Sequence, residues 1–185
     1  IKPIIAAEKE IRVDAIDPGP LEGRVTLQDV SFGYDPKGPA ILENLNIDIR
    51  PGEFLALVGP SGCGKSTIFR LLVGFERPDA GRVLFDGQDL TQLDLGAVRS
   101  QLGCVLQSAE VSAGSMVENI AGSSRVGIDE IWRAAEDAGL AEDIEQMPMG
   151  IHTMISEGGG NISGGQKQRL LIARALVKNP RILLL

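Results

Sequence analysis

The stretch "GPSGCGKST", Gly59 to Thr67, decides the fold, because it matches the spacing G-x-x-x-x-G-K-[ST] of a phosphate-binding loop, or Walker A motif. Glycines at this spacing let the backbone wrap around phosphate groups, so that several N–H groups face them. Lys65 reaches the β- and γ-phosphates of a nucleotide, and the Ser66 hydroxyl ligates Mg²⁺. The predicted nucleotide site consists of Gly59, Pro60, Ser61, Gly62, Cys63, Gly64, Lys65, Ser66 and Thr67.

The residues on either side of this loop predict a strand and a helix. The run "FLALVG", residues 54–59, is short, continuously apolar and ends in glycine, a pattern typical of a strand buried on both faces of a parallel sheet. The run "STIFRLLVGF", residues 66–75, has apolar residues at helical spacing. A strand, a glycine-rich loop and a helix in succession begin a β–α unit, so we expect an α/β domain with a parallel sheet.

The N-terminal part predicts a second, smaller sheet. Residues 23–34 alternate at Val25 and Leu27, and residues 42–53 alternate at Leu45, Ile47 and Ile49 before a turn at Pro51-Gly52, which favours antiparallel strands with one solvated face. Residues 1–22 contain the turn-rich sequence "DPGP" and are interpreted as a linker. The domain itself is expected to span residues 23–185.

The middle of the chain predicts helices inserted between strands. Residues 115–122 and 128–140 carry helical apolar patterns, whereas 103–107 and 181–185 are short apolar strands. We therefore expect an inserted α-helical subdomain at about residues 108–162.

Composition and charge narrow the class of protein. The chain has 185 residues and is 43% hydrophobic, which is enough for one domain with a core. Its net charge of −7 makes it a poor candidate for charge-driven nucleic-acid binding. Cys63 and Cys104 fall in no metal-binding pattern, which disfavours a zinc site and fits a reducing compartment. No apolar run approaches the roughly 18 residues of a membrane span.

A second glycine-rich loop, "ISGGQ" at Ile162 to Gln166, precedes a long helical pattern that Asn179 and Pro180 end. The start of a helix offers free N–H groups and a partial positive charge, which suits a phosphate. This loop, however, has no lysine where a phosphate-binding loop needs one. From the residues alone, a phosphate contact and an ordinary flexible loop before a helix are equally open.

Together with the first loop, "ISGGQ" resembles the signature motif, usually written LSGGQ, of ATP-binding-cassette (ABC) ATPases; the first position is Ile rather than Leu. The resemblance implies a P-loop NTPase (RecA-like) core and the cofactors ATP and Mg²⁺. It also implies a head-to-tail dimer, in which each ATP lies between the phosphate loop of one chain and the signature of the other. The signature residues that act on the partner's ATP would be Ser163, Gly164, Gly165 and Gln166.

The resemblance assigns roles to three further residues. Tyr34 lies where ABC domains place an aromatic ring that stacks on adenine, and Gln107 matches the Q-loop glutamine that ligates Mg²⁺ and senses the γ-phosphate. Lys65 and Gln107 are therefore the expected catalytic residues within the chain. Glu157 resembles the glutamate that contacts the transmembrane partner in exporters. Without the resemblance, these residues would be a core tyrosine, a polar strand end and a solvated acid.

Two longer stretches are similar to a particular kind of ABC protein. Residues 105–124, with the sequence "ENI", resemble exporters, and residues 142–185 resemble the ATPase half of bacterial peptide and bacteriocin exporters of the leader-peptide-processing, type I secretion kind. This likeness implies a preceding transmembrane domain, a homodimer and a location at the cytoplasmic face of a bacterial plasma membrane. ATP hydrolysis would drive export of a substrate, with a peptide expected and with no nucleic-acid partner.

The last five residues, "RILLL" from Arg181 to Leu185, resemble the apolar part of a Walker B strand. In the family an Asp that supports Mg²⁺ follows this part directly, and a Glu that polarises the attacking water comes next. A switch histidine lies further on. The resemblance therefore implies that these three groups lie beyond Leu185, outside the printed sequence.

Alternatives from other classes are a DNA-repair or chromosome-organising ATPase, a soluble cassette acting on ribosomes, and a non-hydrolysing nucleotide-binding regulator. The first carries a long coiled coil between the two motifs, and no heptads occur between Thr67 and Ser163. The exporter-like Glu157 argues against the second. The third stays open because the groups that would aim the attacking water are expected only after Leu185.

We predict that a polypeptide of these 185 residues alone binds ATP weakly and does not hydrolyse it, because phosphoryl transfer depends on positioned groups that these residues do not supply. The test is the ATPase rate of residues 1–185 beside that of the Lys65→Ala variant. A rate well above the variant's contradicts the prediction.

Overall fold

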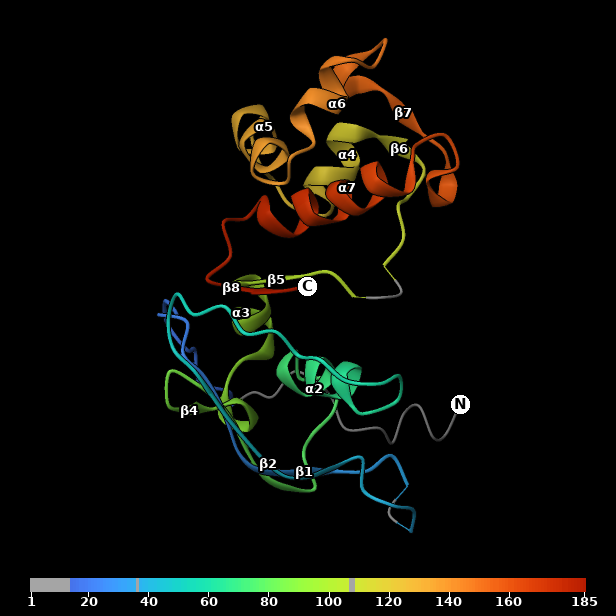
Figure 1. Cartoon of the computed structure of the whole chain (residues 1–185). Coiled ribbons are helices and arrows are strands. Elements are labelled where there is room, and N and C mark those ends of the chain that lie inside the picture. Colours follow the sequence, from blue (N-terminus) through green and yellow to red (C-terminus); the bar gives the residue numbers. More distant parts are fainter. Residues whose placement is uncertain (1–13, 36, 107–108) are drawn as a thin grey trace, which may run out of the picture. The chain divides into compact units, whose positions relative to one another are not determined.

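The computed structural model describes residues 14–35, 37–106 and 109–185. The chain divides after Ser100 into two compact units, which are described separately (Figure 1). Within the described residues, no helix combines the length and the apolar composition needed to cross a membrane.

The first unit contains β1 (Val25–Phe32), β2 (Leu42–Ile49), α2 (Lys65–Leu72), β3 (Ala80–Phe85), β4 (Gln88–Asp89), a 3-10 turn η1 (Leu90–Gln92) and α3 (Leu95–Ser100).

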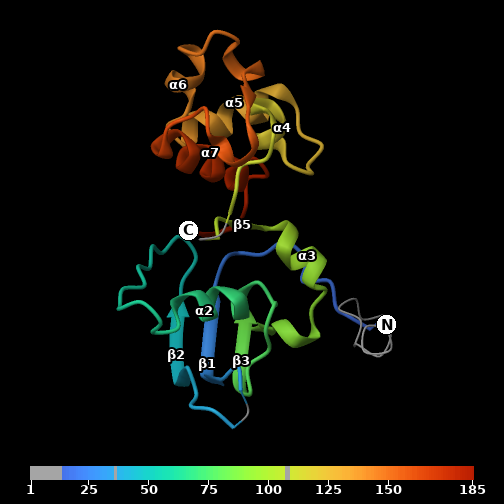
Figure 2. The ribbon, with the colours of Figure 1, turned by 90° about the vertical axis from the view of Figure 1, so that its right-hand side faces the viewer.

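The first unit is built on an antiparallel sheet with the strand order β2-β1-β3-β4. Val25 of the central strand β1 pairs with Ile49 of β2 on one side and with Phe85 of β3 on the other. Helix α2 lies against this sheet and buries Ile68, Leu71 and Leu72 (Figure 2). The predicted N-terminal antiparallel sheet is therefore confirmed, and it includes β3 and β4 as well.

A bulge at Asp29 interrupts the alternation of β1. Val25 and Leu27 are buried, but the next buried residues are Val30 and Phe32, so the inward face shifts by one residue. Asp29 adopts a φ of 50°, and Asn46 of β2 holds it by accepting from the Asp29 N–H at 3.0 Å and donating to Asp29 Oδ1 at 2.9 Å.

The residues just before the sheet are attached to the first unit. Ile16 forms a parallel bridge with Leu93, and Leu21 is buried. The Asp86 carboxylate accepts the backbone N–H groups of Glu22 at 2.7 Å and Arg24 at 2.8 Å. Part of the predicted linker, from Ile16 to Glu22, is therefore held on the first unit by these contacts.

Residues 54–59 differ from the expectation of a buried strand. The structure assigns no strand there, and Phe54 and Val58 are each 90% exposed. An apolar run becomes a strand only when neighbouring backbone groups pair with it, and no described segment pairs with this one. The composition of the run was therefore insufficient to place it in a sheet.

The second unit combines a short parallel ladder with a helical layer. Strands β5 and β8 pair in parallel, with Leu102 opposite Ile182 and Cys104 opposite Leu184, as expected for two apolar strands of an α/β fold. The elements of this unit are β5 (Leu102–Cys104), β6 (Gly114–Ser115), α4 (Met116–Ala121), α5 (Ile128–Asp137), α6 (Ala141–Glu145), η2 (Gly150–His152), β7 (Met154–Ile155), η3 (Glu157–Gly159), α7 (Gly164–Leu176) and β8 (Ile182–Leu184).

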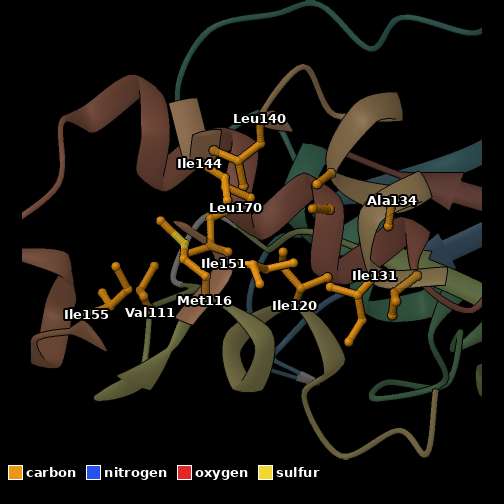
Figure 3. Close-up of a cluster of buried hydrophobic side chains, with 13 residues drawn as sticks. Val111, Met116, Ile120, Ile131, Ala134, Leu140, Ile144, Ile151, Ile155 and Leu170 are labelled. Carbon is orange, nitrogen blue, oxygen red and sulfur yellow. The ribbon is translucent and has the colours of Figure 1, made fainter. Parts of the chain in front are cut away.

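The helices of the second unit pack around one apolar cluster (Figure 3). Leu170 of α7 lies in this cluster and is fully buried, as are Met116 and Ile120 of α4 and Ile144 of α6. Helix α7 is therefore a central element of this core, and its position is set by the side chains of the surrounding helices.

Arg174, near the C-terminal end of α7, bonds this helix to α4 and to the segment before α4. Its guanidinium donates to the Asn119 carbonyl at 2.7 Å, to Asn119 Oδ1 at 2.6 Å and to the Glu110 carbonyl at 3.1 Å. The Asn119 amide, itself buried, donates to the Ser112 carbonyl at 2.9 Å. Burial disfavours the charged guanidinium and lowers the pKa of Arg174 from its ordinary value. The three hydrogen bonds offset part of this cost, because each gives the charged group an oxygen acceptor.

We predict that Leu170→Ala lowers the free energy of unfolding by about 2–5 kcal/mol, because it leaves a cavity in a cluster that cannot fully collapse. The measurement is urea unfolding followed by far-UV circular dichroism. Gln168→Ala, an exposed change on the same helix, serves as the control and should stay within about 0.5 kcal/mol. Equal losses in the two variants would contradict the central position of Leu170.

Candidate functional site

The phosphate loop ends where α2 begins. Gly64 precedes the helix with a φ of 93°, and a Cβ there would lie 2.8 Å from Leu42 Cδ2, so the position requires glycine on two grounds. Gly62 has a φ of 84°, also in the left-handed region. Because the first N–H groups of α2 have no acceptor within the helix, they are available to an anion.

Lys65 folds back over the loop that contains it. Its ammonium donates to the carbonyl oxygens of Gly59 and Pro60, both at 2.8 Å, and approaches Cys63 Sγ at 3.6 Å. An ammonium has three N–H donors, and a thiol sulfur is a weak acceptor. A phosphate oxygen can therefore take the position of the sulfur while the two carbonyls keep the ammonium aimed along the loop.

Tyr34 lies beside the first turn of α2. Its hydroxyl is 3.4 Å from Thr67 Oγ1, and its ring meets Phe32 edge to face at 5.0 Å between centroids. Thr67 is buried, whereas Tyr34 is 54% exposed. The structure thus brings together Tyr34 and the phosphate loop, and it leaves much of the ring free for a planar ligand.

The donor set of this loop fits Mg²⁺ held jointly with a nucleotide. Ser66, the second residue of α2, is exposed, so its hydroxyl is accessible from solvent. Mg²⁺ prefers oxygen ligands and keeps several waters, and one protein hydroxyl combined with phosphate oxygens matches that preference. Gln107, the second predicted Mg²⁺ ligand, lies outside the described residues.

Leu185 directly follows strand β8, the strand that was expected to form the apolar part of Walker B. The pairing of β8 with β5 confirms that this run is a strand of a parallel ladder. The Leu185 side chain is 58% exposed and carries no polar group, so Leu185 itself supplies no site chemistry. The Asp, Glu and His that were expected beyond Leu185 lie outside the described residues and stay a prediction.

The signature loop is closed by a capping box at the start of α7. Ser163 Oγ accepts the Gln166 N–H at 3.1 Å, and Gln166 Oε1 accepts the Ser163 N–H at 2.9 Å. These two bonds fix the side chains of both signature residues. They also leave the hydroxyl hydrogen of the exposed Ser163 free to donate to a ligand.

A carboxylate on a neighbouring helix holds the signature glutamine. Asp143 Oδ1 of α6 accepts from Gln166 Nε2 at 3.1 Å, while Asp143 Oδ2 accepts from Arg169 Nη2 at 2.5 Å and from Arg169 Nε at 3.1 Å. The hydrogen bond from Gln166, followed by those from Arg169, lowers the pKa of Asp143 below its ordinary value. The ionised Asp143 carboxylate therefore stabilises the fold fully when the pH is above the ordinary carboxyl pKa. This contribution is lost as the pH falls through the lower folded-state pKa of Asp143.

The two signature glycines lie open at the surface. Gly164 and Gly165 are both exposed, and a Cβ added at Gly164 would meet no atom within 4 Å. Glycine weakens a helix relative to alanine, and nothing within the second unit requires it at Gly164. The opening is consistent with close approach by a group from outside the chain.

Glu157 is the first residue of the 3-10 turn η3, which lies just before the signature in the sequence. Asn161 accepts the Ser156 N–H at 3.0 Å and donates to the Met154 carbonyl at 2.8 Å, while the Gly158 N–H donates to the Val111 carbonyl at 3.0 Å. Glu157 itself is exposed, so its carboxylate can reach a partner.

Sequence reasoning did not find Asp143, Arg169 or Asn161 as part of this site. The spacing Ser-x-x-Gln of Ser163 and Gln166 is a capping-box signal that could have been read from the sequence. The role of Asp143 could not, because it lies on α6 and meets Gln166 and Arg169 of α7 only in the folded unit.

Comparison with known proteins places this geometry in a family. The chain is 40% identical over 165 residues to the alpha-hemolysin translocation ATP-binding protein HlyB of Escherichia coli. This match covers 89% of the chain and 23% of that protein. It is 44% identical over 164 residues to ABC transporter B family member 13 of Arabidopsis thaliana, covering 88% of the chain and 13% of that protein. The chain therefore spans less than a quarter of the length of these two relatives.

A solved structure supports the same assignment. A bacterial Atm1-family ABC exporter with ATP bound matches with a TM-score of 0.82 and 39% identity, covering 94% of the chain and 32% of that structure. This likeness confirms the predicted P-loop ATPase fold. The family model described as ABC transporter matches residues 42–185, and the chain therefore belongs to the ABC transporter family.

Proposed function

We propose that the chain is the ATP-binding domain of an ABC exporter, in which ATP binding and hydrolysis within a head-to-tail dimer drive export of a substrate across a membrane. The open N-terminus of α7 carries this proposal. Ser163 has a spare hydroxyl donor, and Gly164 is exposed with no atom near the position of a Cβ. Such a surface suits a phosphate group that a second copy of the domain presents.

The first unit would hold ATP by its phosphates. The first-turn N–H groups of α2 and the Lys65 ammonium would bind the phosphate oxygens, and the Ser66 hydroxyl would ligate Mg²⁺. When bound, Mg²⁺ would neutralise charge on the phosphates. Tyr34, which lies beside Thr67, would stack on the adenine, and Gln107 would join the Mg²⁺ site.

The second unit would act on the ATP of the partner domain. Ser163 would donate to a γ-phosphate oxygen, and Gly164 and Gly165 would let the helix start approach closely. Two ATP molecules would then join two domains, and loss of the γ-phosphate would release them. That cycle turns a local change of charge into motion between domains.

The partners follow from the same proposal. Glu157, exposed ahead of the signature, would contact the transmembrane domain, and the domain would lie at the cytoplasmic face of a bacterial plasma membrane. A relative named for alpha-hemolysin translocation supports a secretory role. A peptide cargo is the finer part of the proposal, and it rests on the likeness of residues 142–185 to peptide and bacteriocin exporters.

We predict that Lys65→Ala and Ser163→Ala have different effects in the intact protein. Lys65→Ala should weaken ATP binding by at least about tenfold, because it removes a charge-assisted hydrogen bond to the phosphates. Ser163→Ala should leave ATP binding by the separate monomer within about twofold and lower ATP-driven dimerisation and kcat, because its donor serves the partner's ATP. The measurements are fluorescent-nucleotide titration, light scattering with and without ATP, and steady-state ATPase rates.

Two surface variants serve as controls for this pair. Lys178→Ala removes an exposed lysine far along the chain from the loop, and Ser123→Ala removes an exposed serine outside the signature. Both should behave as the unmodified protein. Equal loss of ATP binding in the Lys65 and Ser163 variants would refute the division of labour between the two loops.

A further inference from the structure

We propose that Asp143 is a positioning residue for the signature serine, acting through Gln166. The inference rests on the proposed function, and it adds a residue outside both glycine-rich loops. Asp143 lies on α6, whereas Ser163 and Gln166 lie at the start of α7.

A continuous chain of hydrogen bonds connects the three residues. Asp143 Oδ1 accepts from Gln166 Nε2 at 3.1 Å, and Gln166 Oε1 accepts from the Ser163 N–H at 2.9 Å. The carboxylate can only accept and the Ser163 N–H can only donate, so the Gln166 amide has a single orientation that satisfies both. Asp143 therefore selects the Gln166 rotamer that closes the capping box.

Arg169 fixes the carboxylate in turn. It donates to Asp143 Oδ2 from two nitrogens, while Oδ1 serves Gln166. Each carboxylate oxygen thus has its own donor. In Asp143→Asn one of these oxygens becomes an NH₂ group, so the side chain must oppose either the Arg169 guanidinium or the Gln166 amide with a second donor.

Asp143 of α6 therefore acts on the position of Ser163 through Gln166, without a direct hydrogen bond to the Ser163 hydroxyl. The Ser163 side chain is exposed and has one free donor, and its direction depends on the capping box. If the Gln166 side chain turns away, the Ser163 backbone N–H loses its acceptor, and the residue that carries the hydroxyl is held at the helix start only by the bond from the Gln166 N–H to Ser163 Oγ. The donor then meets a phosphate in the right direction less often, which lowers kcat rather than the affinity of the phosphate loop.

A double-mutant cycle in the intact protein tests the proposal. Asp143→Asn should lower the ATPase kcat by about fivefold and leave the KM for ATP within about twofold. In a Gln166→Ala background, which cuts the connection to Ser163, the same substitution should have no further effect. Glu145→Gln, an exposed carboxylate on the same helix, is the charge-matched control and should not change kcat.

Two results would overturn the positioning role: an unchanged kcat in Asp143→Asn, or an equal loss of kcat in the original and Gln166→Ala backgrounds. Arg169→Gln separates positioning from stability if Asp143→Asn also lowers the melting temperature. It removes the same ion pair but leaves Oδ1 on Gln166, so similar stability with a smaller kcat loss supports the proposal, and equal kcat losses reject it.

Ser163→Ala, measured in parallel, distinguishes failure of this inference from failure of the proposed function. If that variant keeps its full kcat, the signature has no role in turnover and both proposals fail. If it loses kcat while Asp143→Asn does not, only the positioning role is rejected.

Discussion

The N–H groups in the first turn of a helix have no acceptor within that helix, and both glycine-rich loops of this chain depend on that property. In α2 the helix starts at Lys65 behind a left-handed Gly64, and in α7 it starts behind Ser163. The two helices satisfy their termini differently. A side-chain cap closes α7, whereas Gly64 offers no side chain, so the first turn of α2 stays available to an anion.

This difference matches the two tasks that we propose for the loops. The phosphate loop must surround several phosphate oxygens, which calls for backbone donors and a flexible cation such as Lys65. The signature needs only one directed donor, and a capped helix start supplies it with little loss of entropy when a ligand arrives. The rigid core beneath α7, which includes the fully buried Leu170, keeps that donor in place.

How much the sequence could predict depended on whether a feature is local. The Gly59–Thr67 loop, the strands of the N-terminal sheet and the helix that follows the signature were predicted, because motif spacing and side-chain period are local signals. The bulge at Asp29 was missed, since Asn46 on another strand holds it. Residues 54–59 were expected to form a strand from composition alone, although a strand also needs a neighbour. Asp143 was missed for a similar reason, because only packing of α6 on α7 brings it to Gln166.

The attachment of Arg174 gives α7 a mechanical property as well as a structural one. A helix of 13 residues is about 20 Å long and resists bending over that distance. One end carries Ser163, and the other is bonded to the carbonyls of Glu110 and Asn119. A displacement of the segment around Glu110 would therefore tend to move α7, and Ser163 with it, as one rigid element.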